Sequence, residues 1–111
     1  MNWIRNIILV LAAAPLTAGA GSIELCRAEA SWVEQGAQEW SDGYGPKGTE
    51  KQVRWLYGTI ADSQIISEDR AVELAVDIWN FLESRGYEKP LPIYQREIIA
   101  DVAYKHCLEQ D

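Results

Sequence analysis

Two cysteines and one histidine are the side chains of this 111-residue sequence best suited to nucleophilic or metal chemistry. Nucleophilic catalysis needs a Ser or Cys activated by a neighbouring base. Here His106 has Cys107 beside it, a cysteine that we expect to be oxidised. The sequence has no C-x-x-C, C-x-x-C-H or H-E-x-x-H motif. A single histidine cannot supply the usual zinc or haem ligand sets. The sequence therefore predicts no metal site, no cofactor and no catalytic residue.

His106 itself falls between Ile99 and Val102 on a helical wheel, inside an apolar face. This position predicts a partly buried ring whose hydrogen bonds are satisfied. The alternative is a histidine that senses pH or takes part in catalysis, because its charge changes near neutral pH.

Carboxylates are the other groups that could do chemistry, since a glycosidase-like site needs only an acid and a base of this type. Five of them fall on helix faces that we expect to be solvated or to flank the core: Glu29, Glu39, Glu73, Asp77 and Glu83. We therefore predict that the protein is not an enzyme. A carboxylate-based enzyme is the alternative, and it would need two acidic residues to converge in a concave site.

Residues 1–20 have the pattern of a secretory signal peptide. Arg5 precedes an apolar run over residues 7–14, Pro15 ends the run, and Ala18-Gly19-Ala20 supplies small residues for cleavage. We expect a secreted or periplasmic domain of residues 21–111. An uncleaved signal anchor is the alternative and would be the only attachment to a membrane.

Export would expose the cysteines to an oxidising compartment. Cys26 and Cys107 lie near the two ends of residues 21–111, and we expect a disulfide between them. In the chain-entropy model, closing a loop of roughly 80 residues contributes about 4.5 kcal/mol to stability. Two free thiols or an intermolecular bridge are the alternatives.

The formal net charge is −7. Cleavage of the leader would remove one basic side chain, Arg5, and make the remaining domain more acidic. An acidic surface repels phosphate backbones and anionic lipids, so nucleic acid is not an expected partner. The charge suits a soluble protein or one that binds a basic protein partner.

Apolar residues recur at helical spacing in four segments, and nothing alternates as a strand would. Three of the expected helices cover residues 22–40, residues 67–86 and residues 93–108. The remaining one, second along the chain, is expected to begin with a capping box formed by Thr49 and Gln52. Residues 41–48 read as a loop. These segments predict an all-α fold, a small four-helix bundle with antiparallel neighbours. That topology places Cys26 and Cys107 at the same end, so the disulfide would join the first and last helices.

The segment from Ser67 to Gly86 carries the widest apolar arc, more than half of the helix circumference, and so predicts the central helix of the bundle. Ser67 is expected to cap its start and Gly86 to end it in a left-handed conformation. In the first helix, Gly36 marks a place where another backbone could approach closely. The last helix presents a broad apolar face of Ile98, Ile99, Val102, Ala103 and Cys107.

Two aromatic side chains are candidates for an interface. Trp55 falls opposite the apolar stripe of its helix (Val53, Leu56, Tyr57 and Ile60), and Tyr44 lies at the tip of the glycine-rich loop. Exposed aromatics often anchor protein interfaces. The alternative is that Trp55 covers the loop or packs against Trp40.

The leader, the C-x-x-x-A of residues 26–30 and the A-x-x-x-C of residues 103–107 resemble those of small bacterial periplasmic helical proteins with a two-cysteine clasp. The layout is also similar to that of the immunity proteins that protect the periplasm against type VI secreted toxins. This resemblance implies a protein-binding module of the inhibitor or immunity type. A periplasmic chaperone or envelope-stress protein is the alternative among non-enzymes.

Overall fold

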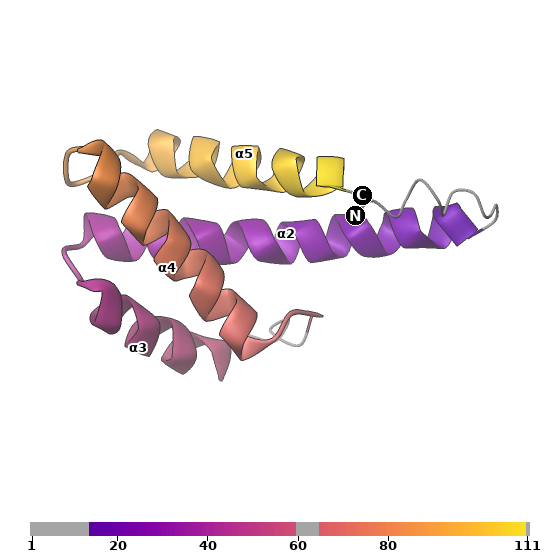
Figure 1. Ribbon diagram of the computed structural model, residues 1–111, viewed down its shortest axis with the longest axis horizontal. Helices are drawn as coiled ribbons and strands as arrows, with labels where there is room; N and C mark the ends of the chain where they lie inside the picture. Colours follow the sequence, from indigo (N-terminus) through magenta and orange to yellow (C-terminus); the bar gives the residue numbers. More distant parts are fainter. Residues whose placement is uncertain (1–13, 60–64, 111) are drawn as a thin grey trace.

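Four helices that alternate in direction make up the described structure (Figure 1). The computed structural model describes residues 14–59 and 65–110, with side chains from residue 23 onward. The helices are α2 (Ala14–Ser41), α3 (Pro46–Tyr57), α4 (Glu68–Arg85) and α5 (Ile93–Gln110). No strand occurs in these two ranges. The predicted all-α four-helix bundle is confirmed.

Helix α2 is the element against which the other three pack. At 28 residues it is about 42 Å long and defines the long axis of the molecule. Its predicted inner face is confirmed, because every member of that face is buried: Cys26, Ala30, Val33, Ala37 and Trp40. The prediction that α4 is the central helix is wrong. The neighbours of α4 are α2 and α3, and the side of its apolar arc that includes Phe81 remains exposed.

The start of α2 bears on the predicted leader. Residues 1–13 lie outside the described residues, and α2 continues from Ala14 across the expected cleavage site after Ala20. The leader therefore stays a prediction, and cleavage there would remove the first seven residues of α2. None of the described helices is long and apolar enough to cross a membrane.

The backbones of α2 and α4 touch at Gly36. A Cβ placed there would lie 2.6 Å from Ala75 Cα and 2.6 Å from Ile78 Cγ2, far inside van der Waals contact. The predicted close approach at Gly36 is confirmed. On either side of this contact lie two buried clusters: Trp32, Val53, Ile66, Ala71 and Ala75 in one, and Ala37, Trp40, Leu82 and Leu91 in the other.

The predicted ends of α4 are confirmed. Ser67 Oγ accepts a hydrogen bond from the Arg70 backbone N–H at 3.1 Å, and Gly86 adopts a left-handed conformation with φ 73°. Glu68 and Asp69 lie in the first turn, where their negative charges interact favourably with the positive end of the helix dipole.

The predicted start of α3 is wrong. The helix begins at Pro46 with Gly45 as its N-cap, so Thr49 lies inside the helix and does not cap it. Proline is well suited to the first helical position because its φ is already helical and it lacks an N–H that would need a partner. Thr49 is fully buried, and its Oγ1 has no hydrogen-bond partner among the described residues.

The predicted disulfide is present and joins Cys26 of α2 to Cys107 of α5, with the Cα atoms 5.5 Å apart. Helix α5 has no fully buried residue and packs mainly on α2. The covalent bond therefore holds in place the helix with the least burial. A disulfide of this kind indicates an oxidising compartment outside the cytoplasm.

Replacing Gly36 with alanine tests the α2–α4 contact. We expect Gly36→Ala to lower the free energy of unfolding by about 2 kcal/mol, because two backbones must separate to admit one methyl group. The matched control is Gly58→Ala: Gly58 has helical φ of −73°, and its added Cβ would meet nothing closer than 3.7 Å. Urea denaturation followed by circular dichroism measures both. Equal effects of the two substitutions would contradict the close packing.

Candidate functional site

A hollowed surface lies between α4 and α5, with Val33 of α2 at its floor. We call it the α4/α5 seam. Two hollows of about 430 Å³ each form it, and they adjoin because both are lined by Val33, Ala103 and His106. In Figure 1, α4 and α5 diverge from the turn that joins them.

The end of the seam nearest the turn is apolar. Its exposed side chains come from α4, the turn and α5: Phe81, Tyr87, Ile98 and Val102. Between 41% and 60% of each remains accessible. The ring centroids of Phe81 and Tyr87 are 6.2 Å apart, and Arg85 Cζ lies 4.8 Å from the centroid of the Phe81 ring. This end therefore presents a preformed apolar surface.

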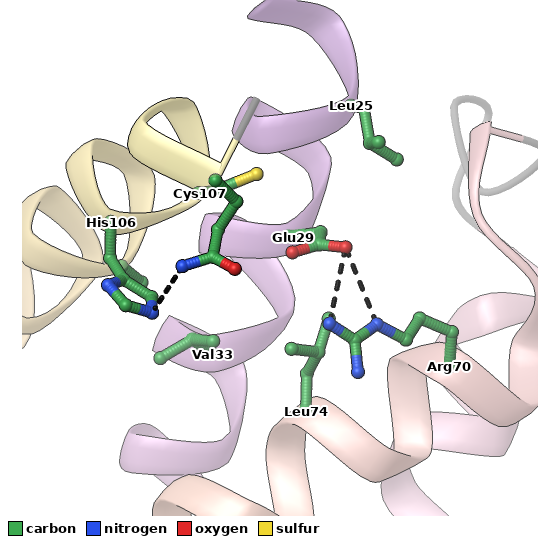
Figure 2. Close-up of a pocket in the computed structure, with 9 residues that line it drawn as sticks. Leu25, Glu29, Val33, Arg70, Leu74, His106 and Cys107 are labelled. Atoms are coloured by element: carbon green, nitrogen blue, oxygen red, sulfur yellow. Dashed lines mark hydrogen bonds and ion pairs between the residues drawn. The ribbon is translucent and has the colours of Figure 1, made fainter. Parts of the chain in front are cut away.

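The end of the seam nearest the disulfide is charged. Figure 2 shows Glu29 of α2 facing Arg70 of α4, and Arg70 Nε and Nη2 each lie 3.4 Å from Glu29 Oε2. Arg70 also donates to Glu73 at 3.0 Å. Burial opposes the positive charge, but Glu73 and Glu29 outweigh it and raise the pKa of Arg70. Arg70 therefore keeps its positive charge, which two carboxylates balance, and its ion pair with Glu29 links α4 to α2.

His106 lies where the two hollows meet, on the α5 side (Figure 2). The prediction of a partly buried ring is wrong, because His106 is exposed. Its ring Nε2 lies 3.2 Å from the Gln110 amide nitrogen, so the histidine is tied to its own helix.

The predicted acidic residues do not gather in the seam. Glu29 is the carboxylate in the charged hollow, and it is paired with Arg70. Glu83 accepts a hydrogen bond from the Trp40 indole at 2.9 Å. The expectation that Glu39 lies on a solvated or flanking face is wrong: only 3% of it is exposed.

Burial raises the pKa of Glu39 above its usual 4.5. A hydrogen bond from the Gln35 side chain offsets part of this effect, and the charge of Asp42 adds to it. One carboxylate oxygen of Glu39, Oε1, has no hydrogen-bond partner among the described residues. Glu39 is thus a buried acid away from the seam.

The two predicted interface residues lie at opposite ends of α3. Tyr44 precedes its first turn, 42% exposed, and its carbonyl accepts a hydrogen bond from the Trp79 indole at 2.8 Å. Trp55 lies in the last turn, 65% exposed, and forms no aromatic pair with Trp40, which is buried. The structure therefore leaves both residues accessible but does not bring them together.

Metal-binding clusters of three or more His, Cys, Asp or Glu side chains do not occur within the described residues. No protein-family model matches the chain, and neither does any curated protein or solved structure in the comparisons. The function must therefore be argued from the geometry of the molecule.

Sequence reasoning missed the seam. It placed Ile98 and Val102 on a broad apolar face of the last helix without indicating that this face is left open, and the structure leaves them 56% and 60% exposed. A signal was present in the sequence: the apolar arcs of the segments that form α4 and α5 are both broad. A helix with a broad apolar arc needs neighbours on more than one side to cover it.

The raised pKa of Glu39 predicts a pH-dependent stability. An acid whose pKa is raised on folding adds most to the free energy of unfolding at pH values below its unfolded pKa. This stabilisation is lost as the pH rises through the folded pKa. We expect Glu39→Gln to unfold at a higher urea concentration than the parent at pH 7, with the difference shrinking toward pH 4. Glu34→Gln, on the same helix and half-buried, is the control. A Glu39→Gln protein less stable than the parent at pH 7 would contradict the assignment.

Exposure of Trp55 predicts that Trp55→Ala changes the unfolding free energy by no more than about 0.5 kcal/mol, because little packing is lost. If Trp55 is an interface residue, the same substitution weakens a partner complex, as measured by titration calorimetry. Val53→Ala is the contrasting control, since Val53 is fully buried and its truncation should destabilise the fold. Loss of folding in Trp55→Ala would assign the tryptophan to the core.

Proposed function

We propose that this protein is an exported protein-binding module of the inhibitor or immunity type, and that it recognises its partner through the α4/α5 seam. The observation that carries the proposal is the set of large apolar side chains exposed side by side: Phe81, Tyr87, Ile98 and Val102. Contiguous apolar surface on a small soluble domain is a common mark of an interaction site.

The scaffold around the seam supports binding without large rearrangement. The floor belongs to α2, whose packing against α4 is fixed by the Gly36 contact, and the disulfide fixes α5 on the other side. A binding surface that is already ordered loses little conformational entropy when a partner arrives. This supports tight, specific binding of the kind that an inhibitor needs.

The proposed location is the periplasm or the medium outside the cell. The predicted leader and the intramolecular disulfide support export. The net charge of −7 supports a basic protein as the partner, because opposite charge steers and orients the encounter.

A periplasmic chaperone is the second candidate, because an open apolar seam also suits weak binding of unfolded chains. The two candidates differ in stoichiometry. An inhibitor holds one partner in a defined complex, whereas a chaperone binds many clients weakly.

The test is capture from envelope extracts with the immobilised, oxidised protein and two matched variants. Ile98→Ser and Ile93→Ser replace the same residue type on the same helix, at positions 56% and 63% exposed, but only Ile98 lines the seam. We expect one stoichiometric partner that survives moderate salt, is lost with Ile98→Ser and is kept with Ile93→Ser. Many weak clients would favour the chaperone, and equal capture by both variants would contradict recognition through the seam.

A further inference from the structure

The α4/α5 seam has the geometry of an unfilled position in a helix bundle. Helices α4 and α5 both pack on α2 but make little contact with each other, so the bundle is open along this side. In Figure 1, α5 runs beside α2 while α4 crosses it obliquely, which keeps the two walls apart. A further helix laid between them would contact α2, α4 and α5 at once.

The length of the seam fits one short helix. Its lining on α5 runs from Ile98 to Gln110, which corresponds to about 18 Å of helical rise, or three turns. The walls are rows of side chains at helical spacing, with Ile98, Val102 and His106 on α5 and Leu74 and Ile78 on α4. Ridges at this spacing accept the ridges of another helix. The described residues offer no strand edge to which an extended peptide could add.

The charge along the rim of the seam indicates which kind of helix could bind there, an acidic or a basic one. Three of the basic side chains near the seam are engaged: Arg70 pairs with Glu29 and Glu73, Lys105 pairs with Asp101, and Arg85 lies against the Phe81 ring. Arg96, two residues before Ile98, is half-buried and forms no ion pair with the described residues. The exposed acids Asp77, Glu97 and Glu109 lie within one turn of Phe81, Ile98 and His106 respectively, and have no ion-pair partner among the described residues. The rim therefore has negative charge to offer.

A second copy of the chain would bring the same acidic rim and another net charge of −7, so like charges would oppose the contact. We infer that the α4/α5 seam binds one amphipathic helix of a partner protein, about three turns long, whose apolar stripe is flanked by lysine or arginine. This inference rests on the proposed function and specifies the chemistry of the partner. The apolar stripe contacts Phe81, Ile98 and Val102, and the basic flanks lie against Asp77 and Glu97.

Three synthetic peptides of about 14 residues test the inference, a length that covers the seam. The first is a helix with a leucine stripe and lysine elsewhere, the second has glutamate in place of lysine, and the third scrambles the first so that no stripe remains. Fluorescence anisotropy with the full oxidised protein measures binding. We expect saturable binding of the leucine–lysine helix alone, with one peptide per protein.

The variants locate the binding. We expect Ile98→Ser to weaken the leucine–lysine peptide about tenfold and Ile93→Ser to leave it unchanged. Asp77→Asn with Glu97→Gln is expected to weaken it too and to reduce its salt dependence. Circular dichroism and urea midpoints establish that each variant is folded. Backbone amide shifts at Val102 and Phe81 of the parent protein report occupancy of the seam on addition of the peptide, so the test does not depend on the folding of any variant.

Several results would overturn the inference. Equal binding of all three peptides, equal effects of the two isoleucine variants, or no binding that depends on Ile98 would each do so. A dimer in sedimentation that dissociates with Ile98→Ser would assign the seam to a second copy instead. If an extract partner depends on Ile98 but the helical peptide does not bind, the helix inference fails while the proposed function stands.

Discussion

The contact between Gly36 and Ala75 is the constraint on which the rest of the structure depends. With no side chain at Gly36, the backbones of α2 and α4 meet directly, and the larger side chains are displaced to either side. They form the two buried clusters, one around Trp32 and Val53 and the other around Trp40 and Leu82. Interiors pack to high density, so a core divided in this way leaves little freedom in how the two helices cross.

The oblique crossing of α4 over α2 has a cost on the opposite side of the bundle. Helix α4 packs toward α3 and diverges from α5, which is left with α2 as its main neighbour. The Cys26–Cys107 bond compensates by holding α5 covalently where burial alone is shallow. The same disulfide that stabilises this small domain therefore also permits one apolar side of the bundle to remain open.

An open apolar seam in an acidic, clasped bundle suggests a mode of recognition in which the partner supplies the missing helix. The covering helix would bury side chains that the chain itself leaves half accessible, such as Phe81 and Ile98. Its charge would complement a rim on which Arg70 and Lys105 are already paired with acids. If the proposed helix binds there, it would cover this part of the apolar surface only in the complex, and partner binding would then add to the stability of the bundle.

The sequence by itself determined the four helical segments apart from the start of α3, the caps of α4, the disulfide, the buried face of α2 and the close approach at Gly36. Each of these follows from local chemistry: periodicity, capping residues, two cysteines, and one glycine on an apolar face. Tertiary structure alone decided that α2 is central, that Thr49 and Glu39 are buried, that His106 is exposed and that Ile98 and Val102 line a seam. The reason is physical. The pattern of a helix specifies which of its faces is apolar, but the crossing angles of its neighbours decide which part of that face is covered.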